Sequence, residues 1–299
     1  MAPNSELNTV IAHLKNLSTR IAERMDIHYR RDCIDEYFGK TANYQELSYI
    51  EQVDINGVNG YWVRPNTEAK RCIFYIHGGS WMSGSIKGYH VYMRELANSC
   101  EANILFIDYA LIPENPFPAG LEDCLKGYQW LLDNNDALPI SVAGDSAGGN
   151  LTLCLLLLLK DKQLPLPATA IAISPCTDMS FSNPSLTERQ DQDPIINGAA
   201  LPLIPMIYAE KGTDLLQPYI SPIYGDLRGL PPLLIQTGMA EVLLDDSIKF
   251  AEKASDSKVV VDLDLWEDMP HVFQGFVPTL PEARAALKKM ASFLDQHKS

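Results

Sequence analysis

The sequence predicts an α/β fold with a mostly parallel central sheet flanked by helices. Short, continuously apolar segments recur along the chain, as expected for strands that are buried on both faces of a sheet. Segments of helical character separate most of them, and this alternation favours a parallel sheet with helices on both sides. The predicted strands of this kind are residues 72–76, 103–107, 139–143, 168–173, 232–236 and 259–265.

The beginning of the chain precedes this alternation and is predicted to be helical. Apolar side chains recur there at intervals of three and four residues, which places them on one stripe of a helix. They are Val10, Ile11, Leu14, Leu17, Ile21 and Met25. Such a stripe packs either on the core or over a functional site. We expect residues 1–45 to form a separate helical segment and residues 46–299 to form the main domain.

Two segments between this region and the first buried strand alternate between apolar and polar side chains. They are residues 47–55 and 59–64, and they are predicted to be strands. The pairs Asn56-Gly57 and Asn59-Gly60 are typical of turns, so we expect the chain to turn at these positions.

Residues 179–222 interrupt the alternation of strands and helices. The stretch is rich in Pro, Ser, Asn and Asp, with only a short apolar helix expected near residues 201–208. Long insertions in compact domains are often lids, and ligands bind at the carboxyl ends of parallel strands. We therefore expect this insertion to form part of a cap over a site at that edge of the sheet.

The composition argues against several classes of function. With 46% hydrophobic and 21% charged residues the chain is typical of a soluble globular protein. Its formal net charge of −14 argues against binding to nucleic acid or to an anionic membrane, and fits either a neutral or cationic substrate or solubility alone. The six cysteines have no metal or redox spacing. No signal peptide is evident, and the longest apolar stretch, residues 151–159, is too short to span a bilayer, so we expect a cytoplasmic protein.

The segment Gly-Asp-Ser-Ala-Gly at residues 144–148 lies between a predicted strand and an apolar helix. Gly-x-Ser-x-Gly at such a turn is typical of a nucleophilic serine, because small flanking residues let the chain turn sharply and expose the hydroxyl. The N–H of Ala147 would then point to where an oxyanion forms. The alternative is that Ser146 only caps the helix.

A second pattern, His77-Gly78-Gly79, directly follows the predicted strand that ends at residue 76. Two adjacent glycines at a strand end can present bare N–H groups to a cavity. Gly78 and Gly79 are therefore predicted to complete an oxyanion hole with Ala147. A plain turn is the alternative. We expect His77 to shape this loop and not to act as a base.

A serine nucleophile needs a base and a carboxylate that orients the base. His271 follows the last predicted strand, so it lies at a carboxyl end and can face Ser146. The carboxylate is expected after the preceding strand, where the candidates are Glu241, Asp245 and Asp246. Glu241 is nearest to the strand end. The alternative is that these acidic residues only favour a helix N-terminus.

Together, these motifs resemble those of the bacterial hormone-sensitive-lipase-like esterases, a family with the α/β-hydrolase fold. The resemblance runs from about residue 40 to the end of the chain. It rests on segments that follow one another in the family's order: residues 77–79, 108–114, 144–149, 174–178 and 269–273. The form Gly-Asp-Ser-Ala-Gly-Gly at residues 144–149 is more specific than Gly-x-Ser-x-Gly alone.

The resemblance implies a role for each matching residue: nucleophile Ser146, base His271, and oxyanion donors Gly78, Gly79 and Ala147. The family's acid is usually Asp, whereas Glu241 stands at the matching position here, with Asp245 as the alternative. The family's third loop glycine is Ser80 in this chain. Family members also carry a lid from N-terminal helices and an insertion, which would match residues 1–45 and 179–222.

The implied activity is hydrolysis of short to medium acyl esters through an acyl-enzyme, without a metal or a cofactor. The alternatives are a lactone hydrolase, a deacetylase or an amide hydrolase of the same fold, and a small-molecule binding protein without turnover. The partner would be a small ester, and homodimer formation stays open. Side chains that could line an apolar pocket are Tyr37, Phe38, Trp81, Met82 and those of residues 201–208.

Overall fold

The computed structural model describes residues 5–24, 26–38, 47–135 and 138–297, and within them it has an eight-stranded sheet in the order β1-β2-β4-β3-β5-β6-β7-β8. The strands are β1 (Ile50–Ile55), β2 (Val58–Val63), β3 (Arg71–Ile76), β4 (Ala102–Asp108), β5 (Ile140–Asp145), β6 (Thr169–Ile173), β7 (Leu233–Gly238) and β8 (Val261–Trp266). Strands β3 to β8 pair in parallel, whereas β1, β2 and β4 pair antiparallel. The prediction of a mostly parallel sheet is confirmed.

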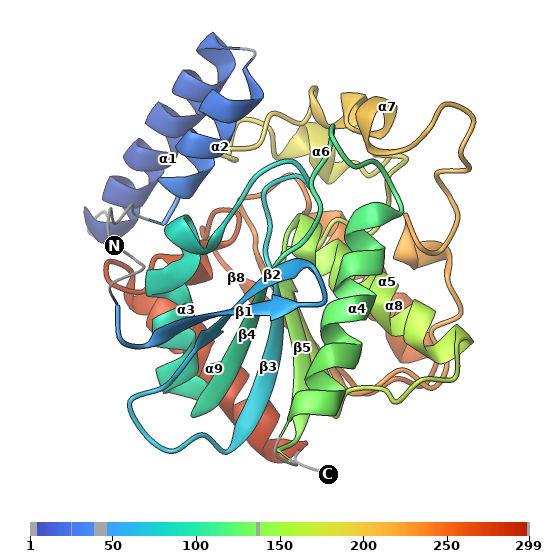
Figure 1. Cartoon of the computed structure of the whole chain (residues 1–299). Helices are drawn as coiled ribbons and strands as arrows, with labels where there is room; N and C mark the ends of the chain where they lie inside the picture. The colour runs from blue at the N-terminus through green and yellow to red at the C-terminus, as the bar shows by residue number, and fades with distance from the viewer. Residues whose placement is uncertain (1–4, 25, 39–46, 136–137, 298–299) are drawn as a thin grey trace.

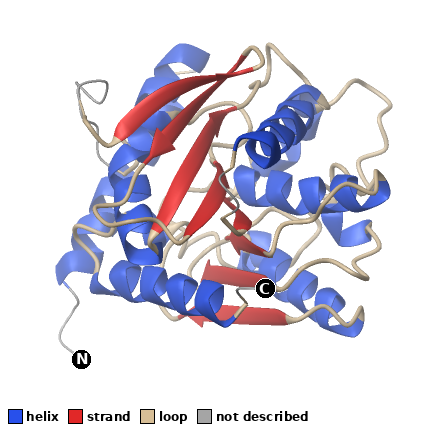
Figure 2. Ribbon diagram, turned by 60° about the horizontal axis from the view of Figure 1, so that its bottom comes forward, coloured by secondary structure: helices blue, strands red, loops and turns tan. Residues whose placement is uncertain are grey.

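Helices cover both faces of this sheet. They are α3 (Ile86–Cys100), α4 (Ala119–Asn134), α5 (Ala147–Asp161), α8 (Leu244–Asp256) and α9 (Pro281–Gln296). Alternate side chains of β3 point to opposite faces, so that Tyr75 packs with α3 and α9 while Phe74 packs with α4 and α5. Figures 1 and 2 show the two helical layers. A strand between two such layers buries both of its faces and is therefore mostly apolar, which is why continuous apolar runs predicted it.

The turn between β1 and β2 consists of Asn56 and Gly57, which have φ values of 52° and 91°. Two residues with positive φ form the kind of turn that matches the twist of a hairpin, and Asn-Gly is favoured there. The second predicted turn, Asn59-Gly60, is wrong because both residues pair within β2.

The N-terminal segment forms two helices, α1 (Ser5–Glu23) and α2 (Ile27–Asp35). Met25 and residues 1–4 and 39–45 of the predicted helical segment lie outside the described residues. The predicted apolar stripe is the buried side of α1, where its side chains pack into the same core as α3 and α9.

Polar contacts attach these two helices to the rest of the chain. Arg31 on α2 donates to both carboxylate oxygens of Glu114, at 2.9 and 2.7 Å, and to the carbonyl of Met82 at 2.8 Å. The Ser18 hydroxyl on α1 donates to the carbonyl of Ile195 at 3.3 Å, which joins α1 to the insertion.

The insertion contains short helical turns only. They are α6 (Ser185–Glu188), the 3-10 turn η2 (Leu201–Leu203) and α7 (Pro205–Tyr208). The predicted single helix over residues 201–208 is therefore wrong, because Pro205 has no N–H to continue the hydrogen bonds of the preceding turn. Figure 1 shows α1 and α2 at the same end of the molecule as α6 and α7. Across the described ranges, no helix is long and apolar enough to cross a bilayer.

Candidate active site

Ser146 lies at the sharp turn between β5, which ends at Asp145, and α5, which begins at Ala147. Its φ of 54° and ψ of −117° are rarely adopted by residues other than glycine, and such strain is found at functional sites. A Cβ atom on Gly148 would collide with the backbone oxygen of Ile76. The small residue beside the serine is therefore needed for the close approach of α5 to β3.

His271 and Glu241 face one another at the carboxyl ends of β8 and β7. The Nδ1 atom of His271 lies 2.5 Å from Oε2 of Glu241. Both side chains are almost inaccessible to solvent, with 5% of His271 and 0% of Glu241 exposed. The hydroxyl of Tyr37 donates to the carbonyl of His271 at 2.7 Å, so the N-terminal segment also supports this loop.

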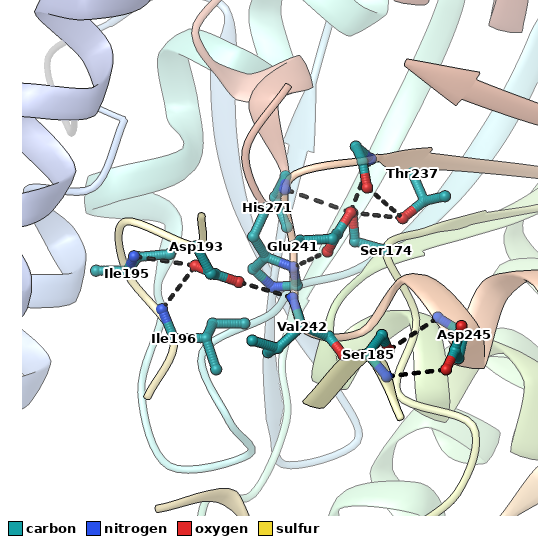
Figure 3. Close-up of polar contacts among 12 residues, drawn as sticks. Ser174, Ser185, Asp193, Ile195, Ile196, Thr237, Glu241, Val242, Asp245 and His271 are labelled. Atoms are coloured by element: carbon teal, nitrogen blue, oxygen red, sulfur yellow. Dashed lines mark hydrogen bonds and ion pairs between the residues drawn. The ribbon is translucent and has the colours of Figure 1, made fainter. Parts of the chain in front are cut away.

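The other carboxylate oxygen of Glu241, Oε1, accepts hydrogen bonds from three donors (Figure 3). Oε1 accepts from the Ser174 hydroxyl at 2.8 Å, the Thr237 hydroxyl at 2.5 Å and the Gly238 N–H at 2.7 Å. Three donors on one oxygen fix the orientation of the carboxylate and compensate for the burial of its charge. The other oxygen is left for the histidine.

Asp193 adds a second negative charge near His271, and it comes from the insertion. Figure 3 shows it beside the pair, where it accepts from the N–H groups of Ile195, Ile196 and Val242 at 2.9 to 3.0 Å. Burial lowers the pKa of His271, but the charge and hydrogen bond of Glu241 and the charges of Asp193 and Asp145 outweigh it, so that the pKa lies above its usual value.

This charge arrangement predicts a pH effect. A histidine that acts as a base must be neutral, so kcat/KM for a neutral ester is expected to rise with pH through the raised pKa of His271. Asp193→Asn removes one charge that raises this pKa, and it should move the acid limb of the kcat/KM profile to lower pH. The matched control is Asp191→Asn, an exposed carboxylate nearby. An acid limb that stays in place or moves to higher pH in Asp193→Asn would contradict the assignment.

The other two acidic candidates lie away from the histidine. Asp245 accepts from the N–H of Ser185 at 2.9 Å. Asp246 is buried, and it accepts from the N–H groups of Thr177 and Asp178 at 2.7 and 3.1 Å. Both residues are in the first turn of α8, but their carboxylates bind the loops that pack against this helix.

The N–H of Gly78 does not face the site, contrary to the prediction that it is an oxyanion donor. It donates to the hydroxyl of Tyr89 at 3.0 Å and to Asp145 at 3.2 Å. Asp145 also accepts from the hydroxyls of Tyr75 and Tyr89, each at 2.8 Å. The Gly78 N–H is therefore already bonded to buried groups that reach it from β5 and α3.

The next two residues of the loop carry the available donors. Gly79 and Ser80 line the cavity over Ser146, together with Ala147. Within the described residues, the N–H groups of Gly79 and Ser80 have no hydrogen-bond acceptor. Gly79, Ser80 and Trp81 all have positive φ, at 108°, 58° and 59°, so the backbone turns sharply where the loop borders the cavity.

His77 contacts the loop that contains Gly78 and Gly79. Its ring is fully buried and stacks on Tyr109 with centroids 4.4 Å apart, and Nδ1 lies 2.7 Å from the carbonyl of Gly78, to which it can donate. Burial lowers the pKa of His77 to about 4, so it stays neutral near pH 7. These contacts agree with a role in shaping the loop.

A cavity of about 500 Å³ connects these groups. It is lined by Ser146 and His271, by the predicted pocket residues Tyr37, Phe38, Trp81 and Met82, and by Leu201, Leu203, Ile204 and Ile207 of the insertion. Helices α1 and α2 and the insertion thus meet over the serine. In the described part of the chain, no group of three or more His, Cys, Asp or Glu side chains is arranged to hold a metal.

Sequence patterns did not identify Asp193 or Ser80 as residues of the site. Asp193 is one of several acidic residues in an irregular stretch, and no local pattern separates it from Asp191. Its contact with Val242, which lies beside Glu241, depends on a fold-back of the insertion. Ser80 was noted in the sequence only because it stands where the family has a third loop glycine.

Comparisons with known proteins agree with this geometry. A family model of the α/β hydrolase fold matches residues 73–275. An acetyl-hydrolase of Streptomyces hygroscopicus is 37% identical over 294 residues, which cover 98% of this chain and 96% of that protein. An esterase of Acinetobacter venetianus is 36% identical over 82% of this chain and 81% of its own length. A crystal structure of an esterase from the bacterial hormone-sensitive lipase family superposes over the whole of both chains with a TM-score of 0.92 and 35% identity.

Proposed function

Because this chain belongs to the bacterial hormone-sensitive-lipase-like esterases of the α/β-hydrolase fold, and is a serine hydrolase of the carboxylesterase type, we propose that Ser146, His271 and Glu241 are its catalytic triad. The contact of His271 with Glu241 in a cavity that Ser146 also lines carries this proposal.

The first half of the proposed reaction forms an acyl-enzyme. With Nδ1–H donated to Glu241, the Nε2 atom of His271 can accept the proton of the Ser146 hydroxyl as its oxygen attacks the ester carbonyl. Glu241 stabilises the imidazolium that results. The N–H groups of Gly79, Ser80 and Ala147 are proposed to bind the oxyanion, and each such donor is worth about 2.7 to 4 kcal/mol in the transition state.

The second half returns the enzyme to its starting state. Formation of the acyl-enzyme is complete when His271 has given its proton to the departing alcohol. His271 then accepts a proton from a water molecule that attacks the acyl group on Ser146. As the second tetrahedral intermediate collapses, His271 returns this proton to the oxygen of Ser146, and the acid is released. Residues 1–45 and 179–222 are proposed to form the cap that excludes bulk water, since the described parts of both segments line the cavity.

We propose esters of short to medium acyl chains as substrates. A cavity of about 500 Å³ is within the usual range for small-molecule sites, and apolar side chains of the insertion and of the N-terminal segment form much of its lining. Longer chains would have to leave the cavity through its opening.

A panel of p-nitrophenyl esters, from acetate through butyrate and octanoate to palmitate, tests this proposal. We expect kcat/KM to be highest for short or medium chains and to be lost in Ser146→Ala. A serine-directed phosphonate should label Ser146 in the wild type. Absence of both turnover and labelling would contradict the proposal and favour a protein that binds small molecules without converting them.

Release of acetyl groups is a second candidate, because one relative is named an acetyl-hydrolase. The same panel separates the two candidates. A deacetylase should prefer acetate over butyrate and octanoate, whereas the size of the cavity supports a preference for the longer acyl groups.

A further inference from the structure

Arg30 on α2 lines the cavity, where most of the other lining residues are apolar. Its Nε atom is buried and, among the described residues, has no hydrogen-bond acceptor. One terminal nitrogen of the guanidinium lies 3.5 Å from the hydroxyl oxygen of Ser80, a distance at the outer limit of a hydrogen bond. The described residues thus leave most of the hydrogen-bonding capacity of this side chain unused.

Arg31, the next residue of α2, differs from Arg30 in that its guanidinium has several hydrogen-bond acceptors. Arg31 forms a two-pronged contact with the carboxylate of Glu114 and also donates to backbone carbonyls. Arg30 has no carboxylate partner in the described part of the chain. Asp145 also lines the cavity, but its oxygens accept from two tyrosines and from Gly78. Burial lowers the pKa of Arg30, the direction expected for a cation that no anion compensates, although a guanidinium stays charged near pH 7.

Arg30 is partly buried, and its Nε atom is inaccessible to solvent. A cation withdrawn from water without a partner destabilises a fold unless something else supplies the opposite charge. A guanidinium is suited to a carboxylate, because its N–H groups match the spacing of the two oxygens. Ser80 belongs to the loop proposed to bind the oxyanion, so Arg30 lies close to where the ester carbonyl would be held. A carboxylate a few bonds away from that carbonyl could reach the guanidinium.

We propose that Arg30 determines substrate specificity by binding a carboxylate of the substrate, and that the preferred substrates are esters with a free carboxylate on either the acyl or the alcohol side. This inference rests on the proposed function, and it names the substrate class for that site. The product of such a reaction on the acyl side would be a short dicarboxylic acid.

Two pairs of esters test the inference in the wild type, Arg30→Gln and Arg30→Lys. Mono-p-nitrophenyl glutarate against p-nitrophenyl butyrate places the carboxylate on the acyl side, and p-carboxyphenyl butyrate against phenyl butyrate places it on the alcohol side. The readout is the ratio of kcat/KM for the charged ester to that for the neutral ester. In Arg30→Gln this ratio should fall by about 10- to 100-fold for one pair, and Arg30→Lys should restore part of it.

Arg24→Gln is the matched control, because Arg24 is an exposed arginine that follows α1 and stacks over Tyr29. In Arg24→Gln, the ratio of kcat/KM for the charged ester to that for the neutral ester should equal the wild-type ratio. If Arg30→Gln leaves the ratio unchanged for both pairs, or if it lowers the rates for charged and neutral esters alike, Arg30 has another role and the inference is wrong.

A binding measurement separates this inference from the proposed mechanism. Titration of monomethyl glutarate into the Ser146→Ala protein by calorimetry should give an affinity that falls by about 10-fold or more when Arg30→Gln is added. Dimethyl glutarate, which is neutral, is the control ligand. Equal affinity of both proteins for monomethyl glutarate overturns the inference even if ester hydrolysis is normal. Conversely, if this affinity depends on Arg30 but the wild-type protein hydrolyses none of the esters, Arg30 remains an anion-binding residue and the triad is rejected.

Discussion

Replacing Ser146 by alanine is expected to lower kcat for p-nitrophenyl butyrate by about 10⁴- to 10⁶-fold, because the attacking oxygen is removed and only binding and oxyanion stabilisation remain. The melting temperature should stay close to that of the wild type. Alanine adopts the positive φ of this turn at a cost similar to that of serine, and the backbone N–H that donates to Ile173 at 2.8 Å is retained.

Ser292→Ala provides the matched control, since Ser292 is an exposed serine on α9, far from the chain segments that line the cavity. It should have wild-type kcat and KM. Activity of Ser146→Ala within a factor of about ten of the wild type, in protein shown to be free of wild-type contamination, would reject Ser146 as the nucleophile.

Replacing Glu241 by glutamine is expected to lower kcat by about 10⁴-fold, through the wrong tautomer of His271. In the wild type, Oε1 accepts from Ser174, Thr237 and Gly238, and Oε2 faces Nδ1 of the histidine. The three donors will keep the amide oxygen of glutamine, so its NH₂ group must face Nδ1. A donor at that position favours the tautomer with the proton on Nε2, which cannot accept the serine proton.

Asp245→Asn is the matched comparison for Glu241→Gln, because it makes the same chemical change at the other candidate acid. Its carboxylate accepts from Ser185, away from His271. We expect kcat to stay within a factor of about ten, with any loss arising from a displaced α6. Steady-state kinetics of both variants decide the assignment. A larger loss in Asp245→Asn than in Glu241→Gln would transfer the role of the acid to Asp245.

The sequence predicted most of the fold because the determinants are local. Buried strands such as β3 are apolar along most of their length, here at residues 72–76, and the Asn-Gly turn between β1 and β2 needs only its own two residues. Predictions of turns and helices failed where the same local pattern is compatible with two different structures. Asn59-Gly60 has turn-forming composition but pairs as a strand, and Pro205 divides a stretch whose apolar residues suggested one helix.

By itself, the sequence determined the α/β class, the strained turn at Ser146, and the position of His271 at a strand end, since each follows from neighbouring residues and from the order of strands. Only the tertiary structure decided that Glu241 and not Asp245 faces the histidine, that the N–H of Gly78 is bonded to Tyr89 and Asp145, and that Arg30 enters the cavity without a carboxylate partner in the described residues. The physical reason is common to all three. A hydrogen bond or an ion pair depends on direction and on a distance of a few ångströms, and the partners are brought together from segments far apart in the chain.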